Sequence, residues 1–200
     1  MPAAGRVATG FDKIYSTLKV VRRKLPSAVA GKAIAQDATP ETFSGSFGDQ
    51  LEQLARSREV ERGFRASMAD TRERPPRPTV VTGHSLGGAL TTLFVMENSS
   101  KHKFDIQTLC SFASPRVGNM EFVRTFDQLP VNSWRIVNTL DLVPKLPPHI
   151  PVLLDYDHVN TAYPFASSSF ARNSLECWHS MNTYLHSLDA TYALLPQCVP

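Results

Sequence analysis

The sequence lacks any long hydrophobic run. No stretch of about 18 consecutive apolar residues occurs in its 200 residues, so the sequence predicts no transmembrane segment. The first residues, MPAAGRVATGFDKIY, also lack the apolar core of a secretory signal peptide. The compartment is therefore left unknown, with a cytoplasmic or organellar location favoured.

The chain also has little net charge and few cysteines. The chain has 21 Lys and Arg against 18 Asp and Glu, a net charge of +3, and no basic cluster long enough to indicate a nucleic-acid partner. Three cysteines do not look like a disulfide framework, and no Cys–His spacing is typical of a metal site, so we expect no metal and no cofactor. Cys110, in an apolar run, is expected to be a small core residue. Cys177 and Cys198 are free to pair in an oxidising compartment, but nothing in the sequence demands it.

What the chain does contain is enough apolar material, 42% of its residues, for one domain with a core. From residue 79 onward, short apolar strands alternate with helical segments. This alternation is typical of parallel strands joined by crossover helices and predicts a three-layer α/β fold with a mostly parallel central sheet. The expected strands are 79–83, 106–112 and 133–138, and the expected helices are 86–98, 119–128 and one near 178–190.

The first part of the chain is less regular. Apolar residues recur at helical spacing over 11–24, which predicts an amphipathic helix. Residues 26–48 are rich in Ala, Ser, Gly and Pro and are expected to be a flexible insertion. A second, highly charged helix is expected between Leu51 and Met68, followed by a proline-rich stop at 72–78. We expect a single domain over residues 1–200.

One short stretch points to chemistry: VVTGHSLGGAL at 80–90 places Ser85 between an expected strand and an expected helix. Such a tight turn forces the serine into a strained backbone conformation, and Gly83 and Gly87 leave room for the chain to double back. The hydroxyl then stands at a helix N-terminus, where the N–H of Leu86 can face a developing oxyanion. The alternative, a plain glycine-rich turn, stays open. A phosphate-binding loop is excluded because the Lys-Ser/Thr pair is missing.

A serine nucleophile needs a base and a carboxylate that orients it. For the carboxylate we favour Asp141, which follows a strand in RIVNTLDLVPKLPP and so is expected at the carboxyl edge of the sheet. Asp155 and Asp157 remain competitors, although a plain loop carboxylate is the commoner role of Asp.

For the base we favour His179, at the entry of the last helix, because the expected chain order is Ser, Asp, His. His158 remains an alternative that would line the same crevice. His84, beside the serine, is expected to point away from it and support the turn. Three further histidines are expected to have no catalytic role. His186 is expected inside the last helix, as a packed or partly exposed polar residue, and His102 and His149 at the surface.

Four blocks together carry a family resemblance: TVVTGHSLGGAL, SFASPRVGN, SWRIVNTLDLVPKLPP and CWHSMNTYLHSL. They resemble, in order, the signature blocks of the class 3 (fungal-type) lipases. That family has an α/β-hydrolase fold and hydrolyses acylglycerols or phospholipids. The resemblance covers residues 79–190 and extends weakly to VATGFDKIY at 7–15.

The resemblance implies that Ser85, Asp141 and His179 are the catalytic triad. It also implies that residues 116–119, Arg-Val-Gly-Asn, support the sheet and loops without a chemical role. One departure concerns Ala8, where the family has a histidine.

Another departure concerns the start of the chain. Family members have an upstream strand ending in an Arg-Gly-Ser/Thr motif, whose hydroxyl residue completes the oxyanion hole, and a lid helix after it. We find neither here, so we expect a truncated member of the family that lacks N-terminal strands and lid.

The leading functional hypothesis is a serine ester hydrolase that cleaves acyl esters of lipids (triacylglycerol, or phospholipid or galactolipid) through an acyl-enzyme. Its expected partner is a lipid ester substrate at a membrane or lipid-droplet surface. Two alternatives stay open: a catalytically impaired lipid-binding or interaction module, and an acyltransferase that uses the same triad.

Overall fold

The structure, a computed structural model, describes residues 5–22, 41–66, 78–101, 104–150, 155–159 and 161–200. Contacts between backbone positions group the chain into two compact units, residues 14–75 and residues 1–13 with 76–200. The single domain expected from the sequence stays a prediction.

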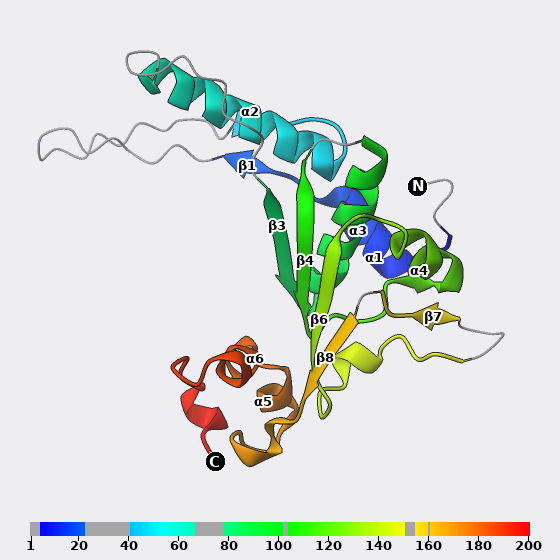
Figure 1. Cartoon of the computed structure of the whole chain (residues 1–200), viewed down its shortest axis with the longest axis vertical. Helices are drawn as coiled ribbons and strands as arrows, with labels where there is room; N and C mark the ends of the chain where they lie inside the picture. The colour runs from blue at the N-terminus through cyan, green and yellow to red at the C-terminus, as the bar shows by residue number, and fades with distance from the viewer. Residues whose placement is uncertain (1–4, 23–40, 67–77, 102–103, 151–154, 160) are drawn as a thin grey trace, which may run out of the picture. The chain divides into compact units, whose positions relative to one another are not determined.

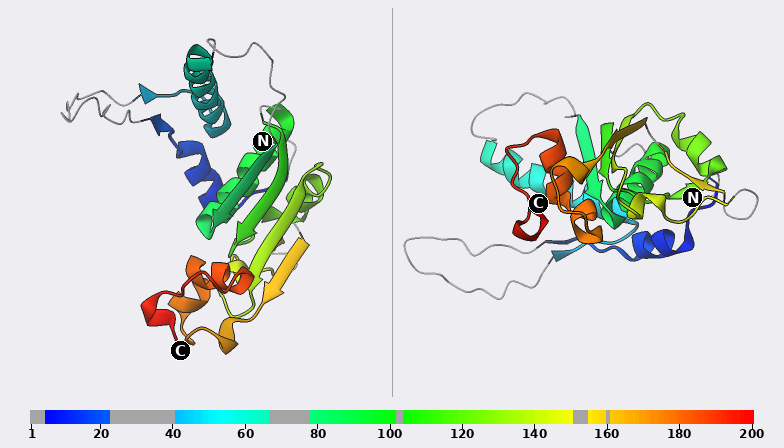
Figure 2. Two further views of the ribbon diagram at one scale, coloured as in Figure 1. Left: turned by 60° about the vertical axis from the view of Figure 1, so that its left-hand side comes forward. Right: turned by 90° about the horizontal axis from the view of Figure 1, so that it is seen from below.

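Four parallel strands form the central sheet of the larger unit, in the order β3–β4–β6–β8 (Figures 1 and 2). This confirms the predicted α/β architecture. Parallel strands end at the same edge of a sheet, so the residues that follow each strand come together there. The strands are β3 (Thr79–His84), β4 (Ile106–Phe112), β6 (Asn132–Asn138) and β8 (Thr161–Phe165).

Helices lie on both faces of this sheet. On one face, α3 (Leu86–Lys101) packs against β3 and β4, where Leu109 is fully buried. Side chains alternate between the faces of a strand, so Phe112 points to the opposite face. There it clusters with Ile136 and with Tyr184 of α6 (Met181–Leu188). The three layers predicted from the sequence are therefore present.

The second face is covered only in part by the described residues. Val80, Trp134 and Tyr163 share it, and 65%, 46% and 51% of their surfaces are exposed. Helix α6 thus covers the end of this face nearest the carboxyl edge, where the apolar cluster lies.

Smaller elements complete the larger unit. The block at residues 116–119 supports its loops: the Arg116 guanidinium donates to the carbonyls of Lys145 and Pro147, and Asn119 caps the next helix through the N–H of Phe122. The elements are β5 (Gly118–Asn119), α4 (Met120–Phe126), the 3₁₀ turn η1 (Val143–Lys145), β7 (Tyr156–Asp157), η2 (Ser167–Ser169), α5 (Leu175–His179) and η3 (Pro196–Cys198).

The smaller unit contains an antiparallel pair, β1 (Val21–Arg22) with β2 (Glu41–Thr42), and the long helix α2 (Phe47–Ala66). Gln50 is its buried polar anchor. Its side chain accepts from the N–H of Val20 and donates to the carbonyls of Leu18 and Gly45. A buried amide is stabilised by such complete hydrogen bonding.

Two predictions for the first part of the chain meet different outcomes. The helix expected over 11–24 is α1, which spans Thr9–Thr17 and ends earlier, because Val21 pairs with Thr42 in a strand instead. The insertion expected at 26–48 falls largely outside the described residues, although α2 already begins at Phe47. Among the helices of the described part, none combines the length and apolar character needed to cross a bilayer.

Replacing Leu109 by Ala should lower the free energy of unfolding by about 2–5 kcal/mol, because it opens a cavity between β4 and α3. Urea denaturation followed by circular dichroism measures this change. The matched control is Val80→Ala, at an exposed position of β3, which should lower the free energy of unfolding by less than about 1 kcal/mol. Equal losses for the two variants would contradict the assigned core.

Candidate active site

Ser85 stands at the turn between β3 and α3, and its backbone φ is +57°, in the left-handed region that few non-glycine residues adopt. The strained conformation expected from the sequence is therefore present. A side chain at Gly83 would run into the backbone of Gly87, which explains the first glycine. A side chain at Gly87 would meet nothing within 4 Å, so the expectation that this glycine is needed to let the chain double back is wrong.

The side chains of Ser85, His179 and Asp141 form a continuous row of hydrogen bonds. The Ser85 Oγ lies 2.8 Å from His179 Nε2, and His179 Nδ1 lies 2.7 Å from Asp141 Oδ2. Because the carboxylate only accepts, Nδ1 carries the ring proton and Nε2 is left to accept from the serine hydroxyl. Such a row lets an imidazole take a proton from an alcohol while the carboxylate stabilises the resulting imidazolium.

Asp141 is 2% exposed and accepts two further hydrogen bonds besides that of His179. The Tyr184 hydroxyl donates to its Oδ2 at 2.8 Å, and the N–H of Val143 donates to its Oδ1 at 2.9 Å. Burial raises the pKa of the Tyr184 phenol, so it stays protonated and able to donate. The Asp141 carboxylate is thereby compensated for the loss of water.

We expected His84 to point away from the site, and this expectation is wrong. Its ring centroid lies 4.7 Å from that of His179, and its Nε2–H donates to the His179 carbonyl at 2.8 Å. Burial lowers the pKa of His84, and the nearby His179 lowers it further, against the opposing effects of that backbone hydrogen bond and of Asp141. The lowered pKa favours the neutral form of the His84 ring.

The prediction of one continuous helix near 178–190 is wrong, because the helix is interrupted at one residue. Ser180 has an extended backbone, with φ −63° and ψ 129°, and separates α5 from α6. The carbonyls of Trp178 and His179, which would continue the helical ladder, accept instead from the side chains of Asn138 and His84. The break places His179 at the end of α5, facing Ser85.

The competing carboxylates lie elsewhere. Asp155 pairs with Arg6 at 3.4 Å, and Asp157 accepts from the backbone N–H of His158. Among the described residues, Asp141 is hydrogen-bonded to His179, and neither Asp155 nor Asp157 is.

The other histidines are also apart from the row. His158 does not share the crevice of His179, because it lines a separate hollow with Asn132 and Trp134, at the start of β6, while Asp141 follows the end of that strand. Half-buried His186 and exposed His149 each bond to a nearby backbone carbonyl. His102 lies outside the described residues.

A hollow of about 450 Å³ opens beside His179 and Asp141. Its walls are mostly apolar and come from the segment after β6, from α5 with the residue that follows it, and from the C-terminal segment. The apolar side chains that line it are Leu142, Val143, Leu175 and Leu195.

Cys177 and Cys198 form a disulfide, which the sequence permitted but did not demand. Both are buried, and Cys177 lies two residues before His179. Cys110 is free and packs against the apolar cluster of the second sheet face, as expected, and burial raises the pKa of its thiol. Among the described residues, no group of three or more His, Cys, Asp or Glu side chains is placed to hold a metal ion.

Sequence reasoning missed two polar residues that support the row, Tyr184 and Asn138. We assigned neither residue a role from the sequence. Asn138 is fully buried, its N–H donates to the Tyr184 hydroxyl, and its side chain donates to Ser167 and to the Trp178 carbonyl. The sequence feature that could have identified Asn138 is a polar amide at the end of an apolar strand.

A serine at a strained strand-to-helix turn of a parallel sheet, with an acid and then a histidine after later strands, defines the α/β-hydrolase class. Within that class, the chain belongs to the lipase (class 3) family, whose sequence profile matches residues 3–150. The family expected from the sequence is confirmed.

Several relatives carry names from this family. The chain is 35% identical over 117 residues to phospholipase A1-II 4 of Oryza sativa subsp. japonica, covering 54% of this chain and 28% of the relative. It is 46% identical over 70 residues to lipase ZK262.3 of Caenorhabditis elegans, covering 34% and 20%. A solved lipase of Rhizopus microsporus var. chinensis shares 26% identity, with a TM-score of 0.42 and coverage of 58% and 41%. The matches thus span less than a third of those two curated relatives.

Replacing His158 by Gln should flatten the dependence of stability on pH between about 6.5 and 4. Burial, the nearby Arg135 and, to a smaller extent, Arg116 lower the pKa of His158 to about 4, against the opposing effects of its hydrogen bond to the Pro144 carbonyl and of Asp157. The unfolded chain then binds a proton that the folded chain does not, so stability falls as pH drops through this window, by about 3 kcal/mol.

Thermal unfolding at a series of pH values measures this effect. Exposed His149, replaced by Gln in the same way, is the control and should keep the slope of the unaltered chain. An unchanged slope in the His158 variant would refute the assignment.

Proposed function

We propose that this chain carries the catalytic triad of a lipid ester hydrolase, with Ser85 as nucleophile, His179 as general base and Asp141 as the carboxylate that orients it. The observation that supports it most is the row of hydrogen bonds at 2.8 and 2.7 Å behind a serine held at φ +57°. Family membership and the names of the relatives support the same reaction class.

The proposed reaction begins when Ser85 Oγ attacks the ester carbonyl and passes its proton to His179 Nε2. The carbonyl oxygen becomes an oxyanion near the N–H of Leu86, the first residue of α3, where helix amides lack intrahelical acceptors. His179 returns the proton to the departing alcohol, leaving an acyl ester on Ser85. Water, deprotonated by His179, then releases the carboxylic acid and restores the serine.

The hollow beside His179 supports an acyl chain as the substrate group. Its lining is mostly apolar, although Glu176 and Ser180 also border it, and it adjoins the triad because His179 and Asp141 line it too. Several side chains near it are exposed although apolar, including Leu142 at 48% and Leu175 at 61%. Exposed apolar clusters of this kind mark binding surfaces, so we propose that this rim contacts a membrane or lipid-droplet surface.

Replacing Ser85 by Ala should abolish both hydrolysis of a 4-nitrophenyl ester and covalent labelling by a fluorophosphonate probe, because the attacking oxygen is gone. Mass spectrometry of the labelled chain locates the adduct. The control is Ser168→Ala, an exposed serine, which should behave as the unaltered chain does. If the unaltered chain shows neither activity nor labelling, the hydrolase proposal fails and a lipid-binding module becomes the better account.

Replacing Leu175 by Asp should lower hydrolysis of a long-chain ester in phosphatidylcholine vesicles about tenfold or more, because a charge in the hollow opposes an acyl chain. Hydrolysis of a soluble acetate ester should change much less. Leu188→Asp, at an exposed position of α6 that does not line the hollow, is the matched control. Equal losses on both esters would contradict the acyl assignment.

A further inference from the structure

We propose that the disulfide between Cys177 and Cys198 positions His179, so that the reactivity of Ser85 depends on that pair being oxidised. The kinetic consequence rests on the proposed function. The structural part concerns only where the imidazole lies and is tested separately below.

The helix that carries His179 is too short to be stable on its own. Helix α5 has five residues, and isolated helices shorter than about 12 residues are marginal in water. Ser174 caps it by accepting from the N–H of Cys177 at 3.2 Å, but a cap does not fix the direction of the helix. That direction must come from contacts with the rest of the unit.

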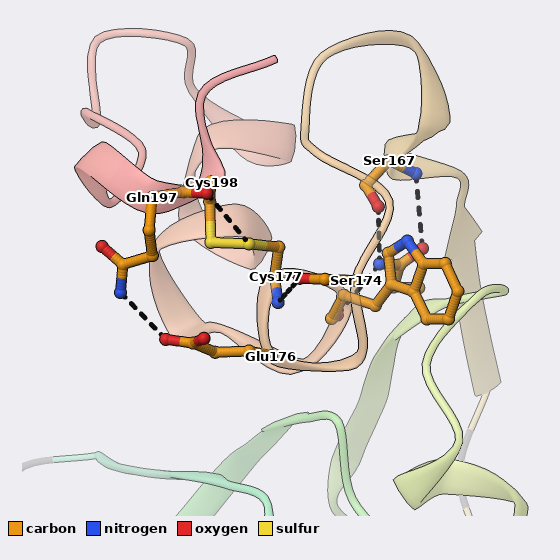
Figure 3. The surroundings of a disulfide bond; sticks show 8 residues. Ser167, Ser174, Glu176, Cys177, Gln197 and Cys198 are labelled. Carbon is orange, nitrogen blue, oxygen red and sulfur yellow. Dashed lines mark hydrogen bonds between the residues drawn. A yellow bond between two sulfur atoms is a disulfide. The ribbon is translucent and has the colours of Figure 1, made fainter.

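Three successive residues of α5 are each tied to a different segment. The Cys177 side chain is bonded to Cys198 in η3. The carbonyl of Trp178 accepts from Asn138 at 2.9 Å, and the carbonyl of His179 accepts from His84 at 2.8 Å. Two of these ties come from strand ends, and the covalent one comes from the C-terminal segment (Figure 3).

The covalent tie acts on the side of the helix away from the serine. Residues two apart in an α-helix are rotated by about 200°, so the side chains of Cys177 and His179 leave on opposite sides. The disulfide thus fixes the back of the turn whose front presents the imidazole. Without it, α5 keeps only hydrogen bonds to its neighbours, at Cys177, Trp178 and His179, and these restrain its rotation less strongly than a covalent bond does.

The same bond also holds one wall of the hollow. Leu195, three residues before Cys198, lines the hollow together with Leu175 of α5. The C-terminal segment is otherwise attached by weaker contacts, such as Arg172 N–H to the Cys198 carbonyl at 2.9 Å and the exposed Gln197–Glu176 hydrogen bond. Loss of the disulfide therefore frees both the imidazole and the surface beside it.

A purely structural staple would behave differently. It would lower the temperature of unfolding while leaving kcat unchanged wherever the chain is still folded. A positioning role changes kcat in the folded chain, because a misplacement of about 1 Å costs up to about a hundredfold in rate.

The experiment compares the oxidised chain with Cys177→Ala, Cys198→Ala and the double variant, on a soluble ester, at a temperature where circular dichroism shows every variant folded. Substitution is used because both sulfurs are buried. We expect kcat to fall about tenfold or more with KM changed less than about threefold. Cys110→Ala, at the free cysteine of β4, is the control and should match the unaltered chain. A kcat within twofold of the unaltered chain in the double variant would overturn the proposal.

A second measurement needs no turnover. The proton on His179 Nδ1, held by Asp141, should give a downfield proton NMR resonance in the oxidised chain. We expect this resonance to shift or vanish in the folded double variant and to persist in Cys110→Ala. An unchanged resonance overturns the positioning role. A resonance that depends on the disulfide in a chain that hydrolyses nothing contradicts the proposed function alone.

Discussion

The buried carboxylate of Asp141 is the group around which the carboxyl edge of the sheet is organised. A charge removed from water is costly unless donors replace the lost solvent, and here three donors do so, from His179, Tyr184 and Val143. Each donor belongs to a different element: α5, α6 and the turn after β6. Satisfying one carboxylate therefore fixes the relative placement of the segments that make the site.

A second layer of hydrogen bonds holds the donors themselves. Asn138 bonds both to the Tyr184 hydroxyl and to the Trp178 carbonyl, so it links α6 to α5 through the end of β6. His84, at the end of β3, holds α5 in a similar way by bonding to the His179 carbonyl. The residues that end the strands are thus polar because they terminate α5 and aim its last side chain. The tight turn at Ser85 completes the arrangement from the other side.

Much of this arrangement was predictable from the sequence. The alternation of strands and helices predicted the parallel sheet, and the pattern around Ser85 predicted the strained turn, because both are local in the chain. The break at Ser180, the ring contact of His84 and the role of Tyr184 were not predictable, since each depends on a partner far away in the sequence. The disulfide was left open for the same reason: pairing requires two cysteines to meet in space, and their spacing does not show that they do. Its presence is typical of oxidising compartments, which the sequence alone did not favour.

The most direct test of the central claim is a crystal structure of this chain after reaction with a phosphonate ester. The account predicts phosphorus bonded to Ser85 Oγ, with one phosphonyl oxygen facing the Leu86 N–H and His179 Nε2 within hydrogen-bond distance of the group. Phosphorus on another residue, or an unreacted serine whose hydroxyl is out of reach of His179, would contradict the account.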